Sequence, residues 1–270
     1  MTRHRVVLWL AAALVAAPFA PLVVQSLAFR WAWPDLLPAT WWWERRDVAP
    51  APLAWDYVLS PYSRVGEATL NTVGIGLAVT ALALMVCLPA ARALARRPHP
   101  GLEAAVALPL LVPEAAVALA LTVLFVRAGL AGSYAGIVVA HLIPTLPYAT
   151  RLLTAVWRGL PSDFEEQAAL LGATPAQVMT RVTLPMLLPG ILAAGLMTFL
   201  VSSNVFLLTF LLGQGSVVTL PTLLFAKLGG GALDASTAGI ALVVALPGLA
   251  LMLLADRLLP RDAWAKGFGA

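Results

Sequence analysis

The sequence contains few charged residues and a single cysteine. Asp, Glu, Lys and Arg make up 11% of its 270 residues, whereas about a quarter of a soluble domain is charged. Cys87 has no second cysteine for an intrachain disulfide and no metal-site partner, so we expect it to be a packing residue. The chain also lacks a GxxxxGKS or GxxxxGKT phosphate-binding loop and any nucleophile or metal constellation. These absences argue against ATP hydrolysis on this chain and predict no catalytic residue, no metal site and no cofactor.

Apolar runs fill most of the chain. Hydrophobic residues make up 61% of the sequence, and its mean hydropathy is +0.89. Several stretches with few or no charges approach the roughly 20 residues that span a bilayer: 6–28, 68–91, 104–126, 133–150, 186–212 and 236–255. The sequence therefore predicts an all-α polytopic membrane protein with about six transmembrane helices.

The first apolar run has an alternative interpretation. The basic start MTRHR and the length of residues 6–17 are also typical of a secretory signal. The run continues past Pro18 to Ala28, which is long enough to span a membrane, so we expect it to be retained as the first helix.

Lys and Arg residues favour one orientation. With the N-terminus in the cytoplasm, most of them fall in cytoplasmic segments, as the positive-inside rule requires. We therefore predict a multi-pass membrane protein with both termini in the cytoplasm. The net charge of +4 follows from this topology and gives no sign of nucleic-acid binding.

The predicted external segment 29–67 is rich in tryptophan and proline. Trp rings prefer the membrane interface, so one interpretation is an interfacial anchor. Aromatic residues are also enriched in protein interfaces, so the other interpretation is a docking surface for a protein outside the cytoplasm. The tryptophans are Trp31, Trp33, Trp41, Trp42, Trp43 and Trp55.

A polar segment between two apolar runs has two sets of helix-capping signals. Ser162 can cap a first helix, with Glu165 completing a capping box. Thr174 can cap a second helix, with Gln177 in the matching position. Gly172 suits the left-handed residue that ends a helix. The pattern predicts a short helix, a sharp corner and a second short helix, which together we call the elbow (161–185).

The elbow resembles the cytoplasmic EAA loop of ABC-importer permeases, whose pattern is EAAxxxG, nine residues, then IxLP. Gln167 replaces the first alanine of that pattern, Val182 replaces the isoleucine, and Pro185 is expected to end the second helix. The segments LPLLVPEAAVAL (108–119), AHLIPTLPYATR (140–151) and SSNVFLLTFLLG (202–213) are similar to the spermidine/putrescine-type branch of that family. The resemblance extends from about Thr69 onward.

The resemblance implies a permease subunit of the type I importer fold in the bacterial inner membrane. A separate ABC ATPase dimer would bind the elbow, an extracytoplasmic binding protein would deliver substrate, and a second permease, which we expect to be a different chain, would complete the pathway in the lipid membrane. The implied domains are a first transmembrane helix (1–28), the external segment (29–67), a permease core (68–258) with the loop at 158–185, and a tail (259–270). The residues implied in ATPase coupling are Glu165, Glu166, Ala168, Gly172, Ala173, Leu184 and Pro185.

Four polar residues inside the apolar runs are candidates for the transport pathway, because ionisable and polar groups in lipid are costly. Glu114 follows a proline and either caps local backbone or lines a path. His141 either bonds to a neighbouring helix or relays protons, and Ser203 and Asn204 either pack helices together or line the path.

The substrate can be narrowed only in part. Polyamine-type relatives have an acidic pair before the phenylalanine, where this chain has Asn204 and Val205. This difference weakens a polyamine assignment and leaves a neutral, zwitterionic or anionic substrate open. We expect a small polar organic solute, polyamine-like, an aminophosphonate or similar.

Two other functions remain open from the sequence. One is a polytopic membrane enzyme that uses Glu114 and His141, although both are isolated in apolar sequence. The other is an ion-driven carrier, for which we would expect more acids in the membrane and an internal inverted repeat.

Overall fold

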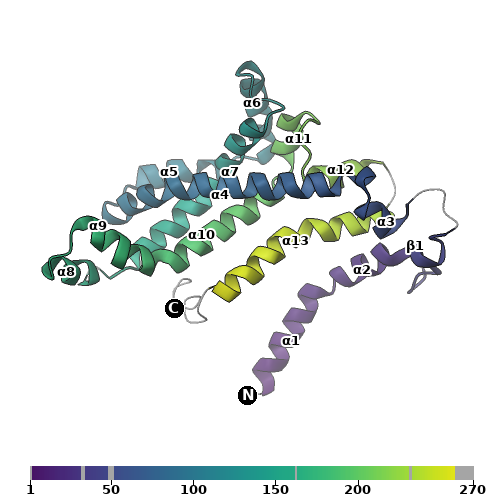
Figure 1. Cartoon of the computed structure of the whole chain (residues 1–270), viewed down its shortest axis with the longest axis horizontal. Coiled ribbons are helices and arrows are strands. Elements are labelled where there is room, and N and C mark those ends of the chain that lie inside the picture. The colour runs from purple at the N-terminus through teal and green to yellow at the C-terminus, as the bar shows by residue number, and fades with distance from the viewer. Residues whose placement is uncertain (1, 32–33, 48–51, 162, 231–232, 259–270) are drawn as a thin grey trace. The chain divides into compact units, whose positions relative to one another are not determined.

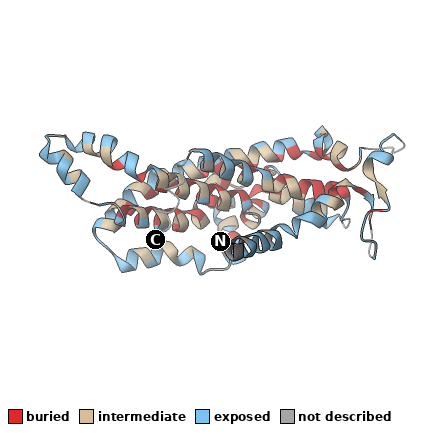
Figure 2. Ribbon diagram, turned by 90° about the horizontal axis from the view of Figure 1, so that it is seen from below, coloured by how far each residue is buried: buried red, intermediate tan, exposed pale blue. Residues whose placement is uncertain are grey.

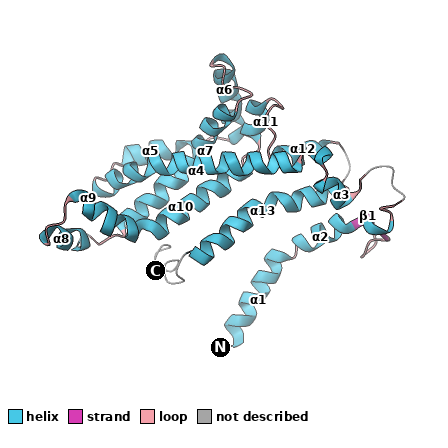
Figure 3. Ribbon diagram, viewed as in Figure 1, coloured by secondary structure: helices cyan, strands magenta, loops and turns pink. Residues whose placement is uncertain are grey.

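The computed structural model describes residues 2–31, 34–47, 52–161, 163–230 and 233–258, and these residues are helical almost throughout (Figure 3). The all-α prediction is confirmed, because the described residues contain no more β-structure than one small antiparallel sheet. Its strands are β1 (Ala28–Arg30) and β2 (Thr40–Trp41). The α-helices are α1 (Thr2–Ala16), α2 (Phe19–Leu27), α3 (Ala54–Leu59), α4 (Val65–Arg96), α5 (Pro100–Ala107), α6 (Glu114–Arg127), α7 (Tyr134–Arg158), α8 (Asp163–Leu170), α9 (Pro175–Val178), α10 (Leu184–Asn204), α11 (Leu207–Gly213), α12 (Leu220–Gly229) and α13 (Ala235–Leu258). The short 3-10 turns are η1 (Trp42–Glu44), η2 (Pro61–Ser63) and η3 (Leu108–Leu110), and η4 (Met179–Thr183) is a π-helical turn.

Residue contacts divide the chain into two compact units. The first comprises Met1–Asn71 and Val218–Pro247, and the second comprises Thr72–Val217 and Gly248–Ala270. Helices α4 and α13 contribute residues to both units, and Figure 1 labels the elements of each.

The first unit has a small apolar core of its own. The amide of Asn71 donates a hydrogen bond of 2.8 Å to the carbonyl of Val218, which fixes the start of α4 against the segment before α12. At the start of α13, Asp234 accepts hydrogen bonds from the backbone N–H of Thr237 (2.7 Å) and from the hydroxyl of Ser236 (2.8 Å). Partial burial raises the pKa of the Asp234 carboxyl, but these hydrogen bonds outweigh that effect and hold the pKa below its usual range. The buried core residues are Val58, Val65, Ala68, Leu220, Ile240 and Val243.

The tryptophan-rich segment of the first unit forms an aromatic cluster. The rings of Trp41 and Trp43 stack with their centroids 5.1 Å apart, and Trp42 meets Trp43 edge to face at 6.3 Å. The guanidinium of Arg46 lies 5.7 Å from the ring centroid of Trp42. Trp33 lies outside the described residues.

The second unit is a bundle in which α10 packs closely against α4 and α7. A Cβ at Gly76 of α4 would lie 2.7 Å from the ring of Phe199 on α10, and a Cβ at Gly190 would collide with Val156 of α7. Only glycine permits these approaches. Figure 2 shows buried residues concentrated on the helix surfaces that face one another. The largest core cluster comprises Ala83, Cys87, Ala91, Ala149, Leu153, Trp157, Leu187 and Ala194, so the predicted packing role of Cys87 is confirmed.

The predicted count of six transmembrane helices is not confirmed. Among the described residues, the segments long and apolar enough to cross a membrane are Val65–Arg96, Tyr134–Arg158, Pro175–Asn204 and Ala235–Leu254, together with one broken pair, Pro100–Leu110 and Glu114–Arg127. By length and composition, the described residues therefore contain four candidate spans, or five if the broken pair counts as one.

Prolines explain part of the difference. The first predicted run, 6–28, is split at Ala17 and Pro18 into α1 of 15 residues and α2 of 9 residues. Pro18 has no N–H to continue the hydrogen bonds of α1. The run 104–126 bends by 91° between η3 and α6, where Pro109 and Pro113 flank the break.

The predicted span 186–212 is also interrupted, so Ser203 and Asn204 lie at the end of a helix and not inside a continuous span. Helix α10 ends at Asn204, Val205 is extended, and α11 begins at Leu207. The side chain of Asn204 donates a hydrogen bond of 2.8 Å to the carbonyl of Leu200. Such a bond from a side chain to local backbone competes with continuation of the helix.

Candidate functional site

The elbow contains the predicted helix, corner and second capping box. Helix α8 ends at Leu170, and Gly172 has φ +85°, a conformation that favours glycine. The N–H of Thr174 donates to Gln177 Oε1 (2.8 Å), and the N–H of Gln177 donates to Thr174 Oγ1 (3.3 Å). The predicted capping box of Ser162 and Glu165 is not described, because Ser162 lies outside the described residues.

The prediction that Pro185 ends the second helix is wrong. Helix α9 passes through the π turn η4 directly into α10, and residues Pro175–Asn204 form one continuous segment. Pro185 stands in the first turn of α10, directly after the π turn. A proline inside an α-helix clashes with the carbonyl four residues earlier, which here belongs to Arg181. The wider π turn relieves that constraint, so the helix continues.

The outer side of the elbow carries large apolar side chains that the sequence interpretation missed. Leu170 and Leu171 are 87% and 89% exposed, and Phe164 is 47% exposed. Glu166 is also exposed, and Gly172 makes the corner beside the leucines. The adjacent leucines in an otherwise polar loop were the signal that could have revealed this surface. Phe164, Leu170 and Leu171 are called the apolar tip below.

The remaining predicted coupling residues differ in their exposure to solvent. Ala168 and Ala173 are half-buried, while Leu184 and Pro185 are exposed at the start of α10. Glu165 is half-buried and turned inward: its carboxylate contacts Thr183 and Arg96. Glu165 and Glu166 are therefore adjacent in sequence but face different surroundings.

A pocket of about 310 Å³ brings together two of the four pathway candidates. Glu114, the first residue of α6, and Asn204, the last residue of α10, both line it, and Tyr148 of α7 adds a phenol. The other described lining residues are Pro, Leu, Val and Ile, so Glu114 is the one charged group among them. The pocket lies where both interrupted helices break.

The other two candidates do not line this pocket. His141 is buried, its Nδ1 is 3.0 Å from the hydroxyl of Ser202, and its Nε2 is 2.8 Å from the hydroxyl of Thr209. Ser203 is buried on the side of α10 that faces Gly76 of α4. His141 thus joins α7 to α10 and α11 across the break. Because Glu114 and His141 have different surroundings, they do not form a joint catalytic site.

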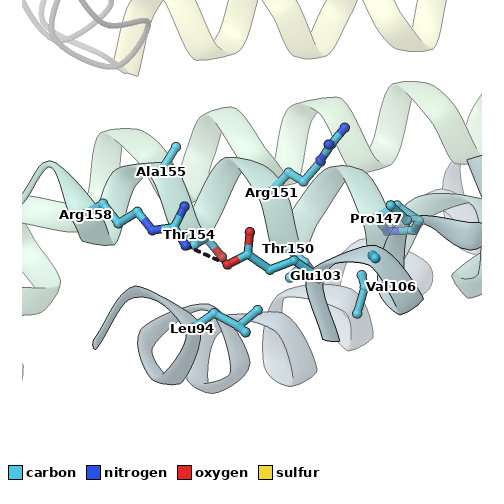
Figure 4. A pocket seen from close by; sticks show the side chains of 11 residues that line it. Leu94, Glu103, Val106, Pro147, Thr150, Arg151, Thr154, Ala155 and Arg158 are labelled. Atoms are coloured by element: carbon cyan, nitrogen blue, oxygen red, sulfur yellow. Dashed lines mark hydrogen bonds and ion pairs between the residues drawn. The ribbon is translucent and has the colours of Figure 1, made fainter. Parts of the chain in front are cut away.

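A second pocket, of about 360 Å³, lies between α5 and α7 (Figure 4). Arg158 and Glu103 form an ion pair of 2.6 Å at its edge. Arg151 also belongs to the lining, but Figure 4 shows its guanidinium pointing away from that pair. Within the described part of the chain, no group of three or more His, Cys, Asp or Glu residues is placed to hold a metal ion.

Comparison with known proteins decides the family. Residues 83–261 match the model described as "Binding-protein-dependent transport system inner membrane component". The chain belongs to this family. It is 32% identical over 198 residues to "Putative ABC transporter permease protein ORF1" of Streptomyces antibioticus, which covers 72% of this chain and 86% of that protein.

Other similar permeases are named for different substrates. The chain is 29% identical over 198 residues to "Trehalose transport system permease protein SugB" of Mycobacterium tuberculosis, covering 71% of this chain and 72% of that protein. It is 34% identical over 188 residues to "Molybdenum transport system permease protein ModB" of Mycobacterium bovis, covering 63% and 70%. The predicted spermidine/putrescine branch is not specifically supported by these names.

A solved structure shares the fold. The chain matches a chain of a bacterial ABC transporter "involved in the import of the acidic polysaccharide alginate" with a TM-score of 0.71 at 14% identity, covering 95% of both chains. The permease is therefore a multi-pass membrane transport subunit of an ABC importer and not an enzyme. Membership of the family implies an ATPase, a substrate-binding protein and a second permease as partners.

Proposed function

We propose that the permease is coupled to its ATPase dimer through the elbow and passes its substrate along the pocket that Glu114 and Asn204 line. The observation that carries the coupling role is the apolar tip. Leu170 and Leu171 are almost fully exposed on a polar loop between two spans. Burial of a leucine side chain is worth about 1.5 to 3 kcal/mol, so a partner that covers both leucines gains a strong anchor.

Glu166 and Gly172 support this docking surface in different ways. The exposed carboxylate of Glu166 offers an ion pair at the rim of the apolar tip. The left-handed corner at Gly172 sets the angle between α8 and α9. Because α9 continues through η4 into α10, a force on the elbow would act directly on a membrane-spanning helix.

In this assembly the elbow and both termini lie in the cytoplasm, and the tryptophan-rich segment lies outside, where the binding protein docks. The distribution of Lys and Arg supports the orientation. The second permease is a different chain, and the two permeases together enclose the pathway.

The substrate is a small polar organic solute that presents amine or hydroxyl groups. Glu114 places a carboxylate in the pocket, and Asn204 and Tyr148 add hydrogen-bonding groups. A carboxylate in an apolar lining repels a free inorganic anion and attracts hydrogen-bond donors. An aminophosphonate or a sugar-like solute fits this lining better than an oxyanion does.

Co-purification of the ATPase with the permease tests the coupling role. Leu171→Asp and Glu166→Lys should insert into the membrane normally but retain about tenfold less ATPase, because each removes an anchor of the docking surface. Leu36→Asp is a matched control, since Leu36 is 88% exposed in the predicted external segment. Normal ATPase retention and normal transport by both elbow variants would rule out coupling through this surface.

Competition for uptake tests the substrate class. In vesicles that contain the complete importer, 2-aminoethylphosphonate or trehalose should compete with the transported solute better than molybdate does. Glu114→Gln should weaken uptake of an amine-bearing solute and reduce discrimination against molybdate, because the repelling charge is gone. If Glu114→Gln discriminates against molybdate as strongly as the wild type does, Glu114 does not take part in substrate selection.

A further inference from the structure

The carboxylate of Glu165 connects three separate segments of the second unit. Its Oε1 accepts a hydrogen bond of 2.7 Å from the hydroxyl of Thr183, and its Oε2 lies 3.2 Å from Arg96 Nη2. Glu165 belongs to α8, Thr183 ends the π turn η4, and Arg96 is the last residue of α4. These residues are called the Glu165 cluster (Arg96, Glu165 and Thr183).

Burial within the cluster distinguishes it from an ordinary surface ion pair. Thr183 is fully buried, and the side chain of Glu165 is 22% exposed, whereas Arg96 reaches it from the solvent side at 60% exposure. An exposed ion pair contributes little to stability, but a carboxylate that also accepts a buried hydroxyl is fixed in one position. The cluster therefore determines the position of α8 more than it determines the stability of the fold.

The π turn η4 lies beside α8 and affects how a movement of α8 reaches α10. Segments of π-helix occur often at functional sites, and η4 lies within the elbow between α9 and α10. Apart from Glu165, α8 is held by the chain on either side of it and by its packing against α9 and η4, and Met179 of η4 packs against the core. With Glu165, a displacement of α8 acts on α10 through Thr183 and on α4 through Arg96.

We propose that Glu165 is a positioning residue that transmits movement of the elbow to α4 and α10 inside the permease and does not itself contact the ATPase. This inference rests on the proposed coupling role of the elbow. It assigns different tasks to neighbouring acids: the exposed Glu166 faces the partner, and Glu165 holds the elbow to the bundle. Loss of Glu165 would leave docking intact and reduce the transport obtained from each ATP.

The experiment measures ATP hydrolysed per substrate molecule transported, with the complete importer in proteoliposomes. Glu165→Gln keeps an oxygen for the Thr183 hydroxyl but removes the charge that faces Arg96. Arg96→Gln breaks the same ion pair from its other side, and Thr183→Val removes the hydroxyl at nearly constant volume. Each should retain a normal amount of ATPase and raise the ratio of ATP to substrate by about threefold or more.

Matched variants control for loss of an ion pair or a hydroxyl elsewhere. Glu103→Gln removes an ion pair of 2.6 Å with Arg158, outside the elbow and the pocket of Glu114, and Thr198→Val removes a buried hydroxyl that bonds within its own helix. Both should keep the wild-type ratio.

Exchange of the charges tests whether the ion pair itself sets the ratio of ATP to substrate. The double variant Arg96→Glu with Glu165→Arg should return the ratio of ATP to substrate toward the wild-type value, since the ion pair is restored in the opposite sense. Wild-type ratios in the single variants would overturn the inference. Loss of ATPase binding in Glu165→Gln without recovery in the exchanged variant would also overturn it, because Glu165 would then contact the ATPase.

Failure of the proposed function has a different signature. If Leu171→Asp and Glu166→Lys retain the ATPase and transport normally, the elbow is not the docking surface. If those variants lose the ATPase while the Glu165 cluster variants behave like wild type, only the positioning role is wrong.

Discussion

His141 is expected to stabilise the helix bundle without taking part in transport. The substitution His141→Leu preserves most of the side-chain volume but removes both hydrogen bonds that join α7 to Ser202 and Thr209. Thr209 keeps a bond of 3.2 Å to the carbonyl of Val205, so its hydroxyl is not left without a partner. A hydrogen bond contributes roughly 0.5 to 1.5 kcal/mol in proteins, and about 0.6 kcal/mol on average between membrane helices. Two such bonds predict a loss of about 1 to 3 kcal/mol in the free energy of unfolding.

Unfolding of the purified permease in mixed micelles by SDS titration measures this loss. Thr198→Val is the matched control, because its buried hydroxyl bonds only to the carbonyl of Ala194 in its own helix and should cost less. Transport normalised to assembled complex should remain near the wild-type rate in His141→Leu. A variant with wild-type stability and no transport would refute the structural role and assign His141 to a proton or substrate path.

Three further outcomes test the elbow, the pathway and the topology. Gly172→Asp should reduce ATPase co-purification by several-fold, because an L-residue at φ +85° costs about 1 kcal/mol and shifts the corner. Unchanged co-purification would mean that docking does not need the corner angle. Asn204→Leu should lower the transport rate per assembled complex, because it removes a polar group from the pocket. A loss of stability with normal transport would instead assign Asn204 to packing. In a Cys87→Ala background, a thiol probe should label Leu36→Cys from outside and Ala176→Cys only after permeabilisation, and the reverse labelling would contradict the orientation.

The elbow could be predicted closely because its signals are local. Thr174 and Gln177 form their capping box through groups three residues apart, and Gly172 adopts the left-handed conformation that its position suggested. The inward contacts of Glu165 were not predictable in the same way, because Arg96 is 69 residues away in the chain. Capping depends on neighbours in sequence, whereas the direction in which an acid faces depends on packing.

The number and continuity of the spans were harder to predict, because hydropathy averaged over a window does not register a short break. The runs 104–126 and 186–212 stay apolar on average although Glu114 and Asn204 stand at their interruptions, so length and composition alone predict one helix for each. Prolines flank the first break and could have suggested it. The second follows Asn204, whose side chain bonds to the backbone of its own helix, and the sequence alone gave no reason to prefer that bond over continuation.

The location of these breaks bears directly on transport. An interrupted helix leaves backbone N–H and C=O groups without their usual partners, and inside a membrane this is tolerated only where the backbone is buried in protein or faces a water-filled cavity. The break before α6 and the break after α10 come from sequence positions about 90 residues apart, yet both line the same pocket through Glu114 and Asn204. Two independent interruptions at one place are difficult to explain by packing alone, since a continuous helix would pack at lower cost. We therefore expect a polar solute to find its backbone and side-chain partners at this pocket, and we expect variants that restore a continuous apolar lining there to impair transport before they impair assembly.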